Sequence, residues 1–260
     1  MDQKKNFPEF YITAPQPCPY LPGRKERKLF THLTQDKPAA LVDSLLKGGF
    51  RRSQNIAYMP YCEECSACVS VRVLVEEFTP DKSMNRVTKR NPDIVAFRNG
   101  SRPTSEQYSL FRGYVDARHA DGGMADMSVL DYAMMVEDSV IDTQITEYRL
   151  RPENGSPNSA GVRPDKWPLV GAALCDHLGD GISMVYSFFE PEYENRSLGT
   201  FMILETLAHA KRMGLTYLYL GYWIEGSRKM NYKARFAPQE RLSSRGWERW
   251  EERGEFGGDG

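Results

Sequence analysis

The sequence has no uninterrupted apolar run near the roughly 20 residues that a membrane-spanning helix requires. Its N-terminus, MDQKKNFPEF, lacks the apolar core of a secretory signal. It also lacks a charge excess, because 34 Lys and Arg and 35 Asp and Glu give a net charge of −1 at pH 7. Non-specific coating of nucleic acid needs an excess of Lys and Arg, so the composition argues against that class. We expect a cytoplasmic protein with no membrane partner.

Cysteine is scarce, and its placement argues against a secreted, disulfide-linked fold. The chain has five cysteines, an odd number, and three of them form the run Cys62-x2-Cys65-x2-Cys68. Together with Cys18 they would supply four thiolates, which suit tetrahedral zinc or an iron–sulfur cluster. Reduced thiols with a structural or substrate-lining role are the alternative. Cys175, alone on an apolar strand, is expected to be a buried small hydrophobe.

The residues that are abundant predict a globular α/β (α+β) protein. At 260 residues, 40% hydrophobic and 12% aromatic, the chain can bury a substantial core. Basic residues gather locally at 24–28, 51–52, 86–90 and 228–235, and such clusters are more often solvated surfaces than binding sites. We predict an N-terminal α/β module with the cysteine cluster over 1–100, an acyltransferase core over 101–240 and a polar tail over 241–260.

Apolar spacing predicts the order of the elements. In chain order these are a helix at 38–47, a strand at 68–78, helices from 105 and at 128–138, a strand at 143–150, a hairpin of 168–176 with 181–189, a helix at 197–213 and a strand at 216–222. The helix at 38–47 ends at a Gly-Gly pair suited to a C-cap, and Ser197 is positioned to cap the later helix.

The last four of these elements, in the order strand, strand, helix, strand, suggest a phosphate-binding turn. Five residues form it, namely Arg196, Ser197, Leu198, Gly199 and Thr200. The unpaired N–H groups of a helix's first turn and its positive dipole end favour phosphate, and a glycine lets the backbone approach. N-acetyltransferase-like (GNAT) enzymes hold the pyrophosphate of an acyl carrier in this way, so we predict a GNAT-like core.

Several longer segments carry a more specific resemblance, which covers nearly all of residues 10–240. They are GFRRSQNIAYMPYCEECSACVSVRV, NRVTKRNPD, FRGYVDARHADGGMADM, MVYSFFEPEYENRSLGTFMILE and YLYLGYWIEGSRKMNYKARFAPQE. In these the chain resembles the arginyl-tRNA–protein transferase family, in its shorter bacterial branch. The resemblance implies transfer of leucine from leucyl-tRNA to an N-terminal Asp or Glu of a protein, which marks that protein for degradation. It also implies a cluster on cysteines, by analogy with eukaryotic relatives.

Such a reaction needs groups that stabilise an oxyanion and return a proton to the leaving ribose oxygen. We expect Tyr222, Tyr232 and Lys233 to supply them, although Tyr222 is equally a core aromatic and Lys233 equally a phosphate contact. Lys229 joins the turn at 196–200 as a predicted donor contact. The transfer itself requires no cofactor.

An acidic acceptor side chain needs a cation, and Arg binds carboxylates with two hydrogen bonds. Arg72 alternates with valines on its strand and is expected to enter a cleft. Tyr58, Lys89 and Arg90 are further predicted acceptor contacts. Arg51 and Arg52 compete with them for this role, or for contacts with the tRNA acceptor stem, and solvent exposure without a role is the alternative for each.

Three other functions remain open. In the first, the enzyme transfers an amino acid from arginyl-tRNA. In the second, it is an ordinary N-acyltransferase whose donor is an acyl-CoA. In the third, the chain is a non-catalytic module that binds tRNA or protein. The turn at 196–200 fits an acyl-CoA enzyme, but such an enzyme has no use for the cysteine cluster and the basic N-terminal half.

Overall fold

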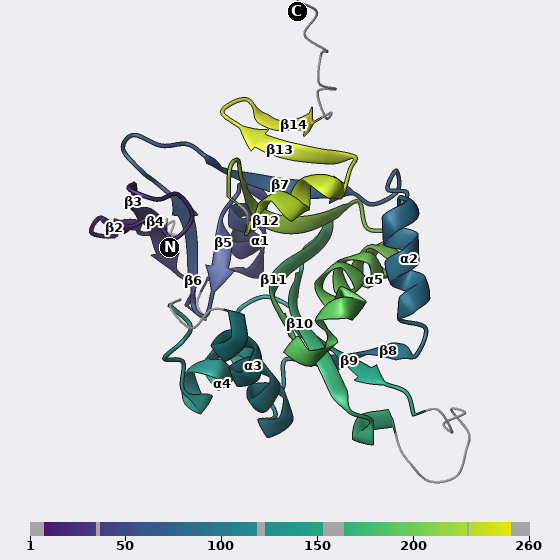
Figure 1. The fold of residues 1–260 in the computed structure, drawn as a ribbon. Helices are drawn as coiled ribbons and strands as arrows, with labels where there is room; N and C mark the ends of the chain where they lie inside the picture. The colour runs from purple at the N-terminus through teal and green to yellow at the C-terminus, as the bar shows by residue number, and fades with distance from the viewer. Residues whose placement is uncertain (1–7, 35–36, 119–122, 153–163, 228, 251–260) are drawn as a thin grey trace, which may run out of the picture.

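A computed structural model describes residues 8–34, 37–118, 123–152, 164–227 and 229–250 (Figure 1). Its strands are β1 Tyr11–Ile12, β2 Gln16–Pro17, β3 Lys25–Glu26, β4 Lys28–His32, β5 Arg51–Ser53, β6 Ile56–Pro60, β7 Cys68–Leu74, β8 Ile94–Gly100, β9 Thr143–Leu150, β10 Leu169–His177, β11 Gly181–Phe189, β12 Tyr217–Ile224, β13 Gln239–Ser243 and β14 Gly246–Trp250. Its α-helices are α1 Ala39–Lys47, α2 Lys82–Arg90, α3 Ser105–Arg118, α4 Val129–Glu137 and α5 Leu198–Arg212.

An eight-stranded mixed sheet organises the fold, in the order β14-β13-β7-β12-β11-β10-β9-β8. Neighbouring strands run antiparallel except β11 and β12, which are parallel. That exception is imposed by the connection, because α5 lies between these two strands and returns the chain to the edge from which β11 began. The predicted α/β class and the local order β10-β11-α5-β12 are therefore confirmed.

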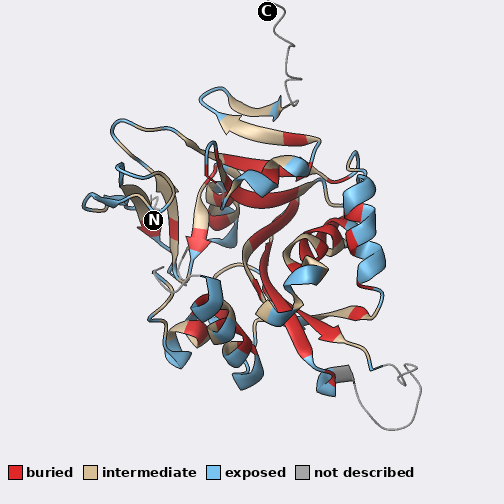
Figure 2. Cartoon of the chain, in the orientation of Figure 1, coloured by how far each residue is buried: buried red, intermediate tan, exposed pale blue. Residues whose placement is uncertain are grey.

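Helices cover both faces of this sheet, and the buried residues lie between the layers (Figure 2). The largest apolar cluster joins α2 and α5 to one face, through Met84, Met202 and Leu207 among others. A second cluster joins α3 and α4 to the other face, where Phe111 and Tyr132 pack on Phe188. The sheet is therefore a rigid platform whose strand ends are fixed from both sides.

A smaller sheet, in the order β1-β4-β6-β5, packs with α1 beside the large sheet. Cys18, Cys62 and Cys65 and most of the N-terminal basic residues belong to this part of the chain, whereas Cys68 is the first residue of β7. Strands β7 and β8, which also precede residue 101, lie in the large sheet instead. The predicted boundary between an N-terminal module ending at residue 100 and a core beginning at residue 101 stays a prediction. The large sheet contains strands from both of these segments.

One local expectation was wrong. Ser197 does not cap α5 through its side chain, because it takes a left-handed conformation with φ 55° and makes no cap hydrogen bond. The first part of the predicted polar tail over 241–260 is packed: β14 pairs with β13, and the Trp247 indole donates to the Lys47 carbonyl at 2.9 Å. Aromatic burial outweighs the charged residues there. Residues 251–260 of the predicted tail lie outside the described residues.

Candidate active site

Strands β11 and β12 stop pairing before either of them ends. Their parallel ladder joins only Gly181–Ser183 to Tyr217–Tyr219, and both strands then continue without pairing to each other. The register of β12 against β7 shifts between Tyr219 and Gly221, where Gly221 has a φ of +78°. A left-handed residue within a strand bends it, and glycine adopts that conformation without steric cost. We call this place, just after Ser183 and Tyr219, the β11–β12 junction.

The Arg51 side chain lies at the β11–β12 junction. It comes from β5 of the small sheet, and its guanidinium donates to Ser183 Oγ at 3.0 Å and to the Met184 carbonyl. A Cβ built on Gly221 would lie 3.0 Å from Arg51 Cζ, so the glycine also makes room for the guanidinium. These two are its recorded hydrogen bonds within the described residues, so three of its five N–H donors remain for another acceptor. The space beside the Arg51 guanidinium is therefore suited to binding an anion.

Two of the predicted catalytic residues, Tyr222 and Lys233, use their polar atoms in hydrogen bonds within the protein. Tyr222 is buried, and its single hydroxyl proton is shared between the Gly49 and Tyr58 carbonyl oxygens, which lie 2.9 and 3.2 Å from the hydroxyl oxygen. Lys233 is only 6% exposed and donates through Nζ to the Tyr222 carbonyl at 2.6 Å. Burial, together with the positive charge of Arg51, lowers the pKa of Lys233 to about 7. Both residues hold the backbone of the site rather than face a substrate.

Tyr232 is the accessible member of the predicted catalytic set. It is 45% exposed, on the 3-10 helix Asn231–Arg235 that follows β12. Desolvation nevertheless raises the pKa of Tyr232 to about 12, and its electrostatic neighbours are Tyr114 and Arg51. Among the described residues, the recorded contact of its ring is with Lys233, whose Nζ lies 5.8 Å from the ring centre. At neutral pH this phenol is protonated and can donate a hydrogen bond.

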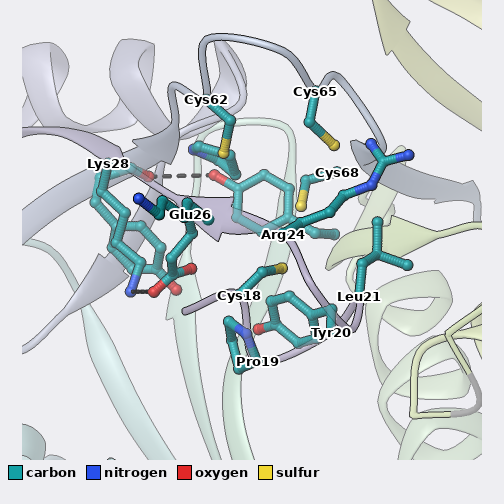
Figure 3. Close-up of a pocket in the computed structure, with 14 residues that line it drawn as sticks. Cys18, Pro19, Tyr20, Leu21, Arg24, Glu26, Lys28, Cys62, Cys65 and Cys68 are labelled. Carbon is teal, nitrogen blue, oxygen red and sulfur yellow. Dashed lines mark hydrogen bonds and ion pairs between the residues drawn. The ribbon is translucent and has the colours of Figure 1, made fainter. Parts of the chain in front are cut away.

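A pocket of about 60 Å³ is formed mainly by residues of the N-terminal part of the chain (Figure 3). It is lined by Cys18, Pro19, Tyr20, Leu21, Arg24, Lys25, Glu26, Lys28, Tyr58, Pro60, Cys62, Cys65, Cys68 and Tyr222. We call it the cysteine pocket. It brings together the four cysteines that the sequence singled out, from two segments more than 40 residues apart in the chain. Tyr58, a predicted acceptor contact, also lines it, with its ring 6.4 Å from that of Tyr222.

The cysteine pocket gathers thiols without arranging them as ligands. In the part of the chain that the structure describes, no group of three or more His, Cys, Asp or Glu side chains is placed to hold a metal ion. Burial and the neighbouring cysteines raise the pKa of the Cys68 thiol to about 12. Zinc or a cluster on these cysteines stays a prediction.

The predicted donor turn lies at the start of α5. Some of its residues make contacts within the protein, and others are at least partly exposed. Arg196 pairs with Asp93 and donates to Asn91 Oδ1 at 2.8 Å, so its guanidinium is engaged. Leu198 is part of the core, and a Cβ on Gly199 would lie 3.3 Å from the Phe189 ring. Ser197, Thr200 and Lys229 are at least partly exposed. The backbone N–H groups of the first turn remain the feature suited to phosphate.

Arg72 does not enter a cleft, contrary to the prediction from strand alternation. Its guanidinium pairs with Glu240 at 2.6 Å and donates to the Tyr219 hydroxyl at 3.1 Å. It also stacks on two rings, with Cζ 3.6 Å from the centre of Tyr217 and 4.3 Å from that of Trp247. Strand β7 is covered on both faces. The alternation of Arg72 with valines therefore did not show whether the face of Arg72 opens into a cleft or packs in a second buried layer. This placement does not support an acceptor role for Arg72.

The remaining predicted cations differ from one another. Arg52 is buried and pairs through two nitrogens with Asp176, both at 2.8 Å. Arg90 donates to the Asn195 carbonyl, whereas Lys89 is exposed on α2. Sequence reasoning missed Gly221 altogether. A glycine inside the apolar run YLYLGYW was the available signal, because a glycine within a strand often marks a bulge or a close approach.

Lys233→Met is expected to remove a pH dependence of stability. Between the folded pKa of about 7 and the ordinary value of 10.5, the unfolded chain binds a proton on Lys233 that the folded protein does not. The free energy of unfolding therefore rises with pH in this window. We expect the wild type to gain up to about 1.4 kcal/mol per pH unit relative to the variant, measured by denaturant unfolding at about pH 6, 7.5 and 9. A difference that is constant across these pH values would mean that Lys233 is charged when folded.

Comparisons with known proteins agree over most of the chain. Residues 106–243 match the family described as the C terminus of arginine-tRNA-protein transferase, and residues 16–86 match its N terminus. The aspartate/glutamate leucyltransferase of Nitrobacter hamburgensis is 60% identical over 243 residues, which are 94% of this chain and 92% of that protein. A Bradyrhizobium protein of the same name is 59% identical over 250 residues, 96% of this chain and 95% of its own. The crystal structure of FemX covers 80% of this chain and 67% of its own with a TM-score of 0.49 and 10% identity.

Proposed function

Because the chain belongs to the arginine-tRNA-protein transferase family, we propose that it transfers leucine from leucyl-tRNA to an N-terminal Asp or Glu of acceptor proteins, which marks them for degradation. It is an aminoacyl-tRNA–protein transferase, with a tRNA and a protein as substrates. Leucine and the acidic acceptor are the specific parts of the proposal, and the names of the relatives support them. Charged tRNA is available in the cytoplasm, so the reaction belongs there.

The chemistry is acyl transfer from an activated ester to an amine. The α-amine of the acceptor attacks the ester carbonyl, and the 3′-terminal ribose oxygen of the tRNA leaves with a proton. An α-amine has a pKa near 8, so a useful fraction is neutral at pH 7 and positioning contributes more than a strong base. The ester needs no further activation, and we propose that the transfer uses no cofactor.

The observation that carries the proposal is Arg51 at the β11–β12 junction. It has N–H donors to spare, its position is fixed by Ser183 and Met184, and its recorded contacts among the described residues include no carboxylate. A guanidinium in this state matches a carboxylate with two parallel hydrogen bonds. We assign Arg51, in place of Arg72, to the side-chain carboxylate of the acceptor's first residue.

Residues around Arg51 complete the site in different ways. Tyr232 carries a phenol that is protonated at neutral pH and is partly exposed, and it is the group we expect to donate to the developing oxyanion or to the leaving oxygen. Lys233 and Tyr222 are positioning residues. The Tyr222 hydroxyl ties β12 to the Gly49 and Tyr58 carbonyls, and Lys233 ties the 3-10 helix Asn231–Arg235 to the Tyr222 carbonyl of β12. The start of α5 supplies backbone N–H groups for a phosphate of the donor.

A transfer assay tests the proposed function. Purified protein is incubated with leucyl-tRNA that carries radiolabelled leucine and with a peptide that begins with Asp, and parallel reactions use labelled arginyl-tRNA or acetyl-CoA as donor. We expect label in the peptide from leucyl-tRNA alone. Label from arginyl-tRNA alone would correct the amino acid, label from acetyl-CoA alone would make the chain an acyl-CoA enzyme, and no label from any donor would favour a binding module.

The same assay addresses the cofactor. One arm uses protein treated with a metal chelator and a thiol reductant, and its metal content is measured before and after treatment. We expect equal rates with and without treatment, because the ester is already activated. A rate that falls with the loss of zinc or iron would contradict the proposal and assign a metal to the cysteine pocket.

A further inference from the structure

Helix α2 presents a row of cations to solvent. Lys82, Arg86 and Lys89 recur at a spacing of about one helical turn and, with Asn85, line one shallow hollow on its surface. The opposite side holds Met84 and Val87, which are the buried residues of the helix and pack in the core. Figure 2 shows α2 as exposed over most of its length. We call Lys82, Arg86 and Lys89 the basic face of α2.

The charges of the basic face are not neutralised by their own protein. In the part of the chain that the structure describes, no ion pair is recorded for any of its three members, although many other basic residues have one. The helix itself contains no acidic residue. The nearby Asp81 caps α2 by accepting the Met84 N–H at 2.8 Å, and that bond lowers the pKa of Asp81. Three cations in a row repel one another, so their arrangement suits a polyanion.

Helix α2 is fixed to the donor turn. Asn91, directly after α2, donates to the Arg196 carbonyl at 3.0 Å and accepts from Arg196 Nε at 2.8 Å. Arg90 donates to the Asn195 carbonyl. Figure 1 shows α2 beside α5, whose N-terminal turn is the proposed phosphate contact. A strand of nucleic acid whose 3′ end lies at that turn can continue along α2.

We infer that the basic face of α2 binds consecutive phosphates of the tRNA donor, adjacent to its aminoacylated 3′ end. This inference rests on the proposed function. From Lys82 to Lys89 the helix rises about 10 Å, at ~1.5 Å per residue. Phosphates on one strand follow each other about every 3.4 Å along a duplex axis, so this length faces about three of them. The first residue of the acceptor has a single side-chain carboxylate, which is too small to pair with all three cations of the basic face of α2.

The inference changes the role predicted for Lys89 and Arg90. The sequence predicts both as acceptor contacts, whereas Lys89 belongs to the basic face of α2 and Arg90 donates to the Asn195 carbonyl. The donor therefore contacts two places, the start of α5 and the basic face of α2. The acceptor is left to Arg51, on a different element.

The salt dependence of tRNA binding tests this inference. The triple variant K82Q/R86Q/K89Q is compared with the wild type in direct binding of uncharged tRNA between about 50 and 200 mM salt. Each lost phosphate contact lowers the slope of log Kd against log salt by about 1, so we expect a decrease of about 3. Over that salt range the wild type then loses about 60-fold more affinity than the variant.

A matched control carries the same change in charge elsewhere. R102Q/K166Q/R245Q alters three exposed cations outside α2 and α5 and is expected to keep the wild-type slope. Transfer from a minimal donor, the leucyl ester of adenosine, should have the same kcat/KM in the wild type and in both variants, because that donor lacks the phosphates.

Three results would overturn the inference. One is an unchanged slope in K82Q/R86Q/K89Q, and another is an equal fall in slope in the control. The third is a rise in KM confined to the acceptor peptide, which would return Lys89 to the acceptor. Failure of the proposed function is separate, because in that case the wild type itself transfers leucine from neither donor.

Discussion

Arg51→Gln is expected to lower kcat/KM for a peptide that begins with Asp by about 100-fold or more. Truncating one partner of a close charge pair costs ~2–5 kcal/mol, and each ~1.4 kcal/mol is tenfold. The glutamine keeps the polarity and much of the length of the side chain but removes the charge. The residue is half-buried at the β11–β12 junction, where little water can replace the lost contact.

The decisive readout is a ratio, because the ratio does not depend on how much of the variant is folded. Wild-type protein should prefer a peptide that begins with Asp over one that begins with Asn, and Arg51→Gln should bring that preference close to 1. Arg51→Lys keeps the charge without the planar fork, so we expect an intermediate preference. If Arg51→Gln keeps the wild-type ratio while losing rate on both peptides, Arg51 serves the reaction in another way.

Arg52→Ala is expected to destabilise the fold by about 3–5 kcal/mol, which is the usual loss when one partner of a buried ion pair is removed. Arg52 and Asp176 are both fully buried, and the Thr143 hydroxyl donates to the same carboxylate at 2.7 Å. The alanine leaves Asp176 charged and without its main partner. Typical domains are stable by only ~5–15 kcal/mol, so a large part of the margin disappears.

Denaturant unfolding measures this loss, and two further variants separate its causes. Arg52→Met with Asp176→Leu removes both charges and should recover much of the stability, because an apolar pair of similar volume avoids the desolvation of ions. Arg98→Ala breaks a more exposed pair with Glu205 and should cost clearly less. A loss below about 1 kcal/mol in Arg52→Ala would show that water or rearrangement satisfies Asp176.

Together these predictions assign two adjacent arginines to different tasks. Neighbouring residues on a strand project in opposite directions, and here they reach different parts of the large sheet. Arg51 contacts β11 at the β11–β12 junction, whereas Arg52 contacts β9 and β10. Arg51→Gln should change the choice of acceptor, and Arg52→Ala should change stability while leaving the choice of acceptor intact in the folded fraction.

The sequence by itself predicted the elements whose signal is local. Helices α1, α3 and α4, strand β9, the β10–β11 hairpin and the helix and strand that follow it all lie within a few residues of their predicted bounds. This information lies in the spacing of apolar residues along the chain and in the glycines, prolines and capping residues that mark the ends of elements. A helix or strand buries one face, so its apolar residues recur at a fixed spacing. The family motifs belong to the same category, because they too are read from contiguous residues.

Only the tertiary structure decided which arginine is available to a substrate. Arg51, Arg52 and Arg72 all lie on strands, and the sequence offered all three as candidates for a substrate contact. Their partners are 133, 124 and 168 residues away, at Met184, Asp176 and Glu240. Strand alternation says which side a residue faces, but not which strand or carboxylate lies opposite. The sheet order settles that, pairing Arg52 and Arg72 with acids and placing Arg51 where two strands stop pairing.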